Sequence, residues 1–117
     1  MTDDCNETWL LAAAEGIRRK RMALGHASLA PRERLTYCLW VADQGMRNAG
    51  ALAAAREVHP AFLEEGRSVA ERLGLSQAAS AFSLPCEDLE QRYFSLFDGL
   101  ATEIRTNEYF ETLSHAC

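Results

Sequence analysis

The apolar residues of this 117-residue chain recur every three or four positions along nearly its whole length. This spacing places side chains on one face of an α-helix, whereas a half-buried strand needs strict alternation of apolar and polar residues. Alanine is abundant and β-branched residues are scarce, which disfavours sheets. The sequence therefore predicts an all-α fold, and its clearest apolar stripe consists of Leu35, Cys38, Leu39, Ala42 and Met46.

Proline and glycine residues mark where the helices are predicted to begin and end. Prolines are expected at three helix starts, and Gly25 and Gly74 are expected to end helices, Gly74 in the left-handed conformation. The predicted helices cover residues 4–24, 51–58, 60–73, 76–82 and 85 onward. One further helix is predicted to begin at residue 31 and to end in the glycine-containing segment 45–50. In the last of these, Asp98-Gly99 predicts a kink, and Thr106 or Asn107 is predicted to cap a separate final turn. We expect residues 1–117 to form a single compact domain, a bundle of five to six helices.

The overall composition indicates a globular protein. The net charge is −5, with 48% hydrophobic and 25% charged residues, which is close to the average for folded domains. The longest purely apolar run, residues 9–14, is far short of the roughly 20 residues that a membrane-spanning helix needs. The first residues, Met-Thr-Asp-Asp, lack the basic and apolar segments of a secretory signal. We therefore expect a cytoplasmic protein without a membrane segment.

Known catalytic and metal-binding motifs are missing from the sequence. The four cysteines, at positions 5, 38, 86 and 117, have none of the paired spacings typical of zinc sites. The signatures of hydrolase nucleophiles, phosphate-binding loops and helix-borne zinc sites are also missing. No catalytic residue, metal or cofactor is therefore predicted. His26 and His59 lie at helix junctions and are interpreted as caps of the preceding helices, with a functional role as the alternative.

The segment 43–50 is the most unusual stretch, because two glycines, an acid and amides lie between two helices. One interpretation is a tight corner, in which glycine lets the backbones approach closely. The other interpretation is a small polar site formed by Asp43, Gln44, Arg47 and Asn48.

Four consecutive bases, Arg18-Arg19-Lys20-Arg21, lie at the end of the first predicted helix. Cations at this position complement the negative end of the helix dipole, and Glu15 is spaced to pair with them. The alternative interpretation is a basic contact surface. An acidic protein without a wider basic face is poorly suited to direct nucleic-acid binding, which is therefore not predicted. Phe94 falls off the apolar stripe of its helix, and an exposed aromatic side chain there would allow a homodimer.

Two stretches together resemble a bacterial domain-of-unknown-function family, the one that includes DNA mimic protein nineteen. The first is residues 33–43, ERLTYCLWVAD, followed by Asn48-Ala49-Gly50, and the second is residues 88–96, DLEQRYFSL. The resemblance covers roughly residues 30–110. The chain departs from the family pattern at the corner, where Ala49 replaces a glycine and Gly45 stands where a carboxylate is common. These departures weaken any site that the family builds there.

The resemblance implies an all-helical fold and, from the family's characterised member, binding to a DNA-binding protein by imitation of the charge of DNA. On this basis the prediction is a non-enzymatic protein-interaction domain whose protein partner is a DNA-binding regulator. The alternative is a small-molecule-binding protein or small enzyme with its site at the Asp43–Asn48 corner. The residues expected to form the acidic partner-binding face are Glu64, Glu65, Glu71, Glu87, Asp88, Glu90 and Asp98.

Overall fold

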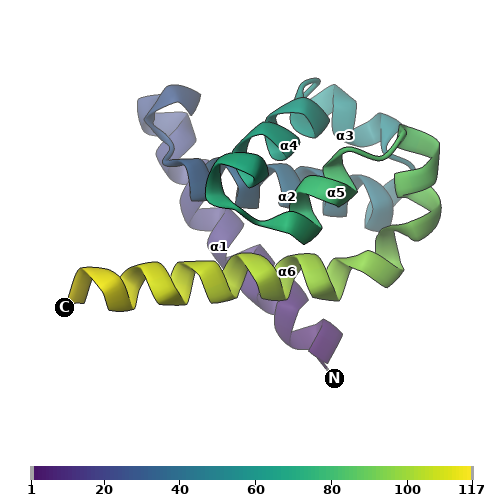
Figure 1. Ribbon diagram of the computed structural model, residues 1–117. Helices are drawn as coiled ribbons and strands as arrows, with labels where there is room; N and C mark the ends of the chain where they lie inside the picture. The colour runs from purple at the N-terminus through teal and green to yellow at the C-terminus, as the bar shows by residue number, and fades with distance from the viewer. Residues whose placement is uncertain (1, 117) are drawn as a thin grey trace.

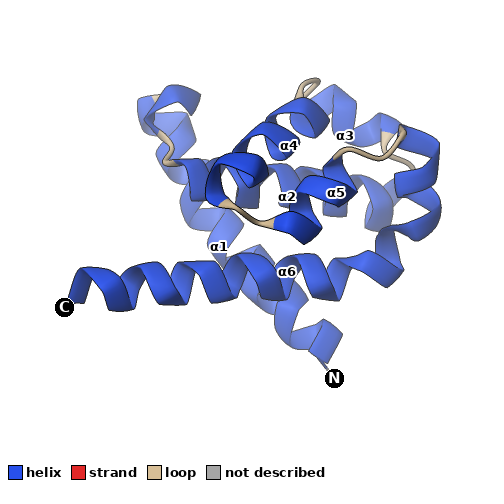
Figure 2. Ribbon diagram, viewed as in Figure 1, coloured by secondary structure: helices blue, strands red, loops and turns tan. Residues whose placement is uncertain are grey.

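The computed structural model describes the backbone of residues 2–116 and the side chains of residues 5–107. Figure 1 shows the arrangement of the helices, and Figure 2 shows that the described backbone contains no strand. The prediction of an all-α bundle is confirmed. The helices are α1 (Thr2–Leu24), the short 3-10 helix η1 (His26–Ser28), α2 (Pro31–Ala49), α3 (Ala53–Val58), α4 (Phe62–Leu73), α5 (Ser76–Phe82) and α6 (Cys86–Ala116).

Helix α2 lies at the centre of the bundle and packs against α1, α3, α4 and α6. The stripe predicted from the sequence is its buried face, and Tyr37 and Val41 widen that face. Helix α6 contributes a second buried stripe, formed by Leu89, Tyr93, Phe97, Leu100 and Ile104. Burial of the α2 face against α1, α3, α4 and α6, and of the α6 face against α1, α2 and α5, supplies most of the driving force for folding.

Two glycines allow helices to approach more closely than any side chain would permit. A Cβ on Gly45 would lie only 3.0 Å from the carbonyl oxygen of Ala51, and one on Gly66 would lie 2.8 Å from the ring of Phe82. The second helix was predicted to end within the glycine-containing segment 45–50, and α2 runs through Gly45 and ends at Ala49, with Gly50 as its left-handed cap. Gly45 is therefore needed for the packing of α3 against α2 and not for a turn.

Other boundaries differ from the sequence prediction, two of them for clear structural reasons. Helix α4 begins at Phe62 and not at Pro60, because His59 is extended and the Phe62 amide closes a turn onto its carbonyl oxygen. Helix α6 bends in its N-terminal part but continues to Ala116, so the separate final turn predicted after Thr106 or Asn107 was wrong. No helix within the described part of the chain is both long and apolar enough to cross a bilayer.

Candidate functional site

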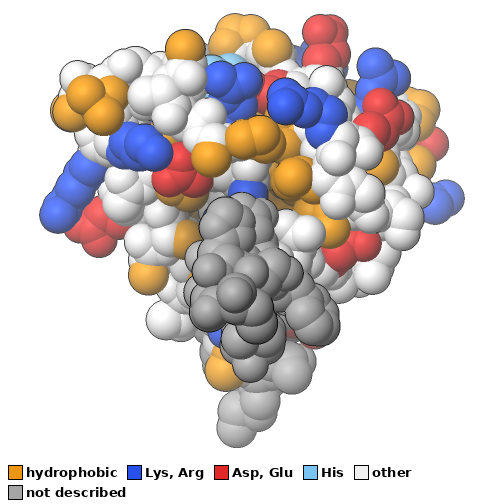
Figure 3. Space-filling model, turned by 60° about the vertical axis from the view of Figure 1, so that its left-hand side comes forward, with side chains coloured by type: hydrophobic (Ala, Val, Ile, Leu, Met, Phe, Trp, Pro, Cys, Tyr) orange, Lys and Arg blue, Asp and Glu red, His pale blue; other side chains and the backbone are white. Residues whose placement is uncertain are grey.

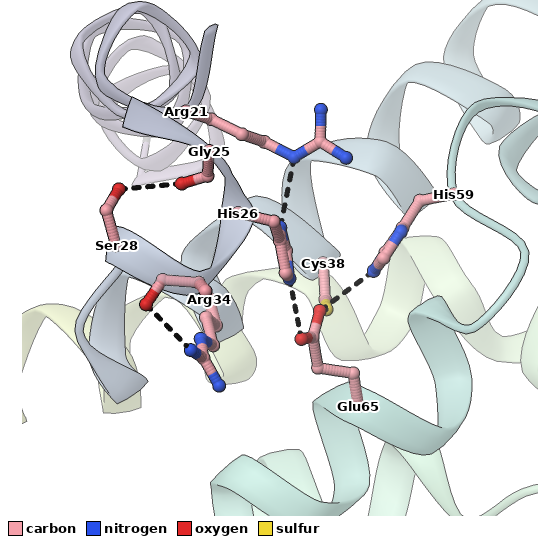
Figure 4. Close-up of polar contacts among 9 residues, drawn as sticks. Arg21, Gly25, His26, Ser28, Arg34, Cys38, His59 and Glu65 are labelled. Atoms are coloured by element: carbon pink, nitrogen blue, oxygen red, sulfur yellow. Dashed lines mark hydrogen bonds and ion pairs between the residues drawn. The ribbon is translucent and has the colours of Figure 1, made fainter. Parts of the chain in front are cut away.

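Three potential metal-binding side chains from distant segments meet at one edge of α2. His26 opens η1, His59 follows α3, and Glu65 lies in the first turn of α4 (Figure 4). His26 Nε2 lies 2.7 Å from Glu65 Oε2, and His59 Nε2 lies 2.8 Å from Glu65 Oε1. One donor atom from each residue lies within 4.8 Å of the other two. We call these three residues the histidine–glutamate cluster.

Local structure explains why both imidazoles face Glu65. Gly25, with φ of 90°, ends α1 and turns the chain, and the Ser28 hydroxyl holds this turn by donating to the Gly25 carbonyl oxygen over 2.6 Å. The His26 and His59 rings then pack against each other with centroids 5.1 Å apart. Tyr37, from the buried face of α2, contacts both rings edge-on. An aromatic platform therefore sets the orientation of the two imidazoles.

Cys38 lies at the buried side of the cluster. Its thiol is fully buried and donates to Glu65 Oε1 over 3.3 Å. Burial raises the pKa of the Cys38 thiol well above its ordinary value, and the nearby Glu65 carboxylate raises it further. The thiol is therefore protonated at neutral pH in the metal-free protein.

Glu65 is an anion that accepts three hydrogen bonds. Burial alone would raise the pKa of its carboxyl group, but the hydrogen bonds from His26, His59 and Cys38 outweigh burial and lower it. The exposed fraction of the side chain is 26% for His26, 14% for His59 and 18% for Glu65. Imidazole surface is visible among basic side chains in Figure 3. A small solute can therefore reach the cluster from solvent.

Arg21 determines which nitrogen of His26 carries the proton. Its Nε donates to His26 Nδ1 over 3.0 Å, and its guanidinium lies 4.9 Å above the ring of Tyr37. Because a guanidinium can only donate, Nδ1 must be unprotonated. The proton of His26 is consequently on Nε2, from which it is donated to Glu65.

Sequence reasoning missed this site, since it predicted no metal ligand. It interpreted both histidines as caps, and His59 does occupy the C-cap of α3, where its backbone N–H donates to the Ala55 carbonyl oxygen. The site was missed because 33 positions separate His26 from His59. Metal-site recognition from sequence depends on short spacings. The one usable signal was that each histidine lies at a helix junction, His26 after Gly25 and His59 before Pro60.

The corner predicted as a polar site is occupied by internal contacts. Asp43 is fully buried, and Arg47 Nε donates to both of its carboxylate oxygens, over 2.9 and 3.0 Å. The Tyr93 hydroxyl of α6 donates to Asp43 Oδ1 over 2.7 Å. Gln44 and Asn48 pair separately at the surface, over 3.0 Å. A ligand at this corner would therefore meet Gln44 and Asn48 but not Asp43.

Arg47 extends this buried network to two more helices. Its guanidinium lies 3.6 Å from Glu7 of α1 and stacks over Phe94 and Phe97 of α6. Burial raises the pKa of the Tyr93 phenol far above its ordinary value, and the Asp43 carboxylate adds to this effect. The Asp43–Arg47 pair thus holds α1, α2 and α6 together.

Of the seven acids expected on a partner-binding face, some are exposed at the surface and others form hydrogen bonds within the molecule. Glu65 belongs to the histidine–glutamate cluster, Glu90 accepts from the Leu52 amide, and Asp98 accepts from Asn6. Glu64, Glu71 and Glu87 are exposed, and Asp88 is partly exposed. Glu64 lines a surface hollow together with Arg56 and Arg67, so its surroundings are of mixed charge.

The basic run at the end of α1 is engaged within the molecule. Arg18 lies 4.7 Å above the ring of Trp40, Arg19 pairs with Glu15, and Lys20 pairs with Glu33 of α2. These contacts agree with the interpretation of the run as a helix end. The face shown in Figure 3 likewise mixes acidic and basic side chains.

Comparisons with protein-family models, curated proteins and solved structures found no match to this chain. The resemblance to the family of DNA mimic protein nineteen therefore remains a prediction, and the candidate function depends on the geometry of the site.

Proposed function

We propose that this protein binds a divalent transition-metal ion, with zinc as the first candidate, between His26, His59 and Glu65. The observation that carries the proposal is the convergence of two imidazole nitrogens and a carboxylate oxygen to within 4.8 Å of one another. Two histidines with one glutamate are a recurrent zinc ligand set.

The donor atoms favour transition metals over magnesium or calcium. Imidazole nitrogen suits zinc, copper, iron and nickel, whereas magnesium and calcium prefer all-oxygen sites. Zinc–nitrogen and zinc–oxygen bonds of about 2.0 Å place neighbouring ligands about 3.3 Å apart in a tetrahedron. The present nitrogen–oxygen distances of 2.7 and 2.8 Å need to widen by only about 0.5 Å to reach that separation. Rotation of partly exposed side chains supplies such a movement.

Metal binding at Nε2 requires the other tautomer of His26, whose single proton is now on Nε2. That proton would leave to water as Nε2 binds the ion, and Nδ1 would take up a proton from water, so the ring stays neutral. Glu65 is already an anion and neutralises part of the added charge. The hydrogen bonds that now join the three side chains are replaced by bonds to the ion.

The test is a zinc titration in competition with a chromogenic chelator, using the full chain, H59A and E65Q. E64Q is the matched control, because Glu64 lies on the same helix and is exposed. We expect one zinc ion per chain, with affinity at least 100-fold weaker in H59A and E65Q and unchanged in E64Q. Circular dichroism checks that each variant is folded. Equal affinities in E65Q and E64Q would overturn the proposal.

We propose as a second candidate the protein-interaction role, in which an acidic surface binds a DNA-binding regulator. The observation that favours it is that Glu64, Glu71 and Glu87 are exposed and make no ion pair with any other described residue. The presence of Arg56 and Arg67 beside Glu64 argues for a mixed-charge interface over close imitation of DNA.

This second candidate predicts a charge-dependent association. We expect the unaltered chain to capture a DNA-binding protein at low salt and to release it at high salt. The triple variant E64Q/E71Q/E87Q is expected not to capture that protein at low salt. The control is E15Q, which removes an acid on α1 that pairs with Arg19. A captured protein that is retained equally by both variants would contradict an acidic interface on α4 and α6.

A further inference from the structure

We infer that Cys38 supplies the fourth ligand of the metal site as a thiolate, so that the ion is held by two histidines, one glutamate and one cysteine. This inference rests on the proposed metal site and deepens it. It assigns a chemical role to a buried thiol that the sequence indicated only as a small apolar core residue.

The first argument is geometric. Cys38 Sγ lies 3.3 Å from Glu65 Oε1, the oxygen that also faces His59. In a tetrahedral zinc site, a sulfur bonded at about 2.3 Å and an oxygen bonded at about 2.0 Å lie about 3.5 Å apart. The sulfur is therefore already close to the separation from Glu65 that shared coordination requires. It lies outside the group of donor atoms that are all within 4.8 Å of one another, so at least one imidazole must move inward as the ion binds.

The second argument concerns direction. The imidazoles and Glu65 retain exposure and approach the site from the solvent side, whereas the Cys38 side chain is fully buried. Figure 4 shows the sulfur beside the Glu65 carboxylate oxygen that faces His59. A fourth donor on the interior side closes the coordination sphere where water has no access. A site with four protein ligands is typical of a structural or regulatory ion, while a catalytic site keeps one position for water.

The exchange is balanced in atoms and charge. The S–H bond of Cys38 breaks as the sulfur–metal bond forms, and the proton leaves to solvent. Glu65 Oε1, which accepts the thiol hydrogen in the metal-free protein, is released to bind the ion. No change of oxidation state is involved.

A thiolate ligand makes the site selective for metals with high affinity for sulfur. Zinc, cadmium and cobalt(II) are expected to bind, and manganese and magnesium are not. A site made of two imidazole nitrogens and one carboxylate oxygen, without the thiolate, would prefer these metals less strongly.

The experiment is cobalt(II) titration of the full chain monitored by absorbance. Thiolate coordination gives a sulfur-to-cobalt charge-transfer band in the near ultraviolet, and tetrahedral geometry gives intense visible bands. We expect both signals in the unaltered chain. In C38S we expect loss of the charge-transfer band, retention of cobalt binding and at least tenfold weaker zinc binding.

The control is a variant in which Cys5, Cys86 and Cys117 are all replaced by serine, which leaves Cys38 as the sole thiol. It is expected to keep the charge-transfer band. Cobalt that binds without this band, or a band that persists in C38S, would overturn the role of Cys38 while leaving the metal site standing. Absence of cobalt and zinc binding to the unaltered chain would overturn the metal site and this inference together.

Discussion

Arg21 provides a direct test of how a metal ion would enter the histidine–glutamate cluster. Its Nε donates to His26 Nδ1 over 3.0 Å, which requires that Nδ1 carry no proton. A metal bound at Nε2 requires the opposite, because the neutral imidazole then carries its proton on Nδ1. The hydrogen bond from Arg21 to His26 must therefore break when the ion binds, while the guanidinium stays close by, above the ring of Tyr37. We expect R21Q to tighten zinc binding, since a glutamine oxygen can accept a hydrogen bond from Nδ1 and orient the ligand.

The size of this effect follows from the positions of the charges. With a metal–nitrogen bond of about 2.1 Å, the ion would lie about 7 Å from the Arg21 Nε. At this separation one positive charge repels a divalent ion by about 1 kcal/mol in the dielectric of water. His26 is 26% exposed, so this solvent-screened figure applies. Adding the new hydrogen bond predicts roughly tenfold tighter binding, equivalent to about 1.4 kcal/mol.

The assay is the chelator competition applied to the unaltered chain, R21Q and R19Q. Arg19 is the matched control, because it lies on the same helix, is exposed and pairs with Glu15 over 2.7 Å. We expect R19Q to bind zinc as the unaltered chain does. If R21Q binds zinc no more tightly than R19Q, the reasoning about proton placement and charge at His26 is refuted.

Three further predictions concern stability, each measured as the free energy of unfolding in urea. D43N is expected to destabilise the protein by about 3 kcal/mol, because it removes the charge that pairs with the partly buried Arg47; a loss below 1 kcal/mol would contradict a structural role. G66A is expected to destabilise by about 1–3 kcal/mol through the clash with Phe82, whereas G16A, which meets no atom within 4 Å, is expected to stabilise by about 0.5–1 kcal/mol. Stabilisation by both would show that the backbone effect outweighs the clash with Phe82. The third change, E33Q, is expected to lower stability at pH 7. Burial raises the pKa of Glu33, but the hydrogen bonds from the Ala30 amide and Lys20 outweigh it and lower that pKa below 4.5. The stabilisation is therefore present above about pH 4.5 and is lost as pH falls through the folded-state pKa, so the difference between E33Q and the unaltered chain should vanish in acid. A difference that persists at pH 2 would exclude the carboxylate as its cause.

The fold was accessible from the sequence because its determinants are local. The stripe from Leu35 to Met46 and the stripe from Leu89 to Ile104 repeat with the helical period, and both are buried. Gly74 was predicted as a left-handed helix end, and its φ of 73° confirms this. At segment 45–50 the close approach predicted for glycine is confirmed at Gly45, whereas the helix end falls at Gly50, because the sequence does not distinguish a glycine that permits close helix packing from one that ends a helix.

The candidate site could not be predicted from the sequence in the same way, because only tertiary packing brings its residues together. The pairing of Asp43 with Arg47 follows from i, i+4 spacing, but the Tyr93 hydroxyl that completes it comes from 50 residues away. The meeting of His26, His59 and Glu65 depends on how η1, the end of α3 and the start of α4 are placed around α2, which no local pattern specifies. Helix propensity and periodicity carry no information about this tertiary arrangement.

The separation of the cluster residues along the chain has a consequence for folding. The contact between His26 and Glu65 spans 39 positions and encloses all of α2 and α3. An ion that binds both residues closes this segment into a ring. Cross-linking a loop of this size lowers the entropy of the unfolded chain by an amount equivalent to about 4 kcal/mol, according to the chain-entropy model used for disulfides. A metal ion bound at the cluster would thus act as a cross-link that a chelator removes without any change to the sequence.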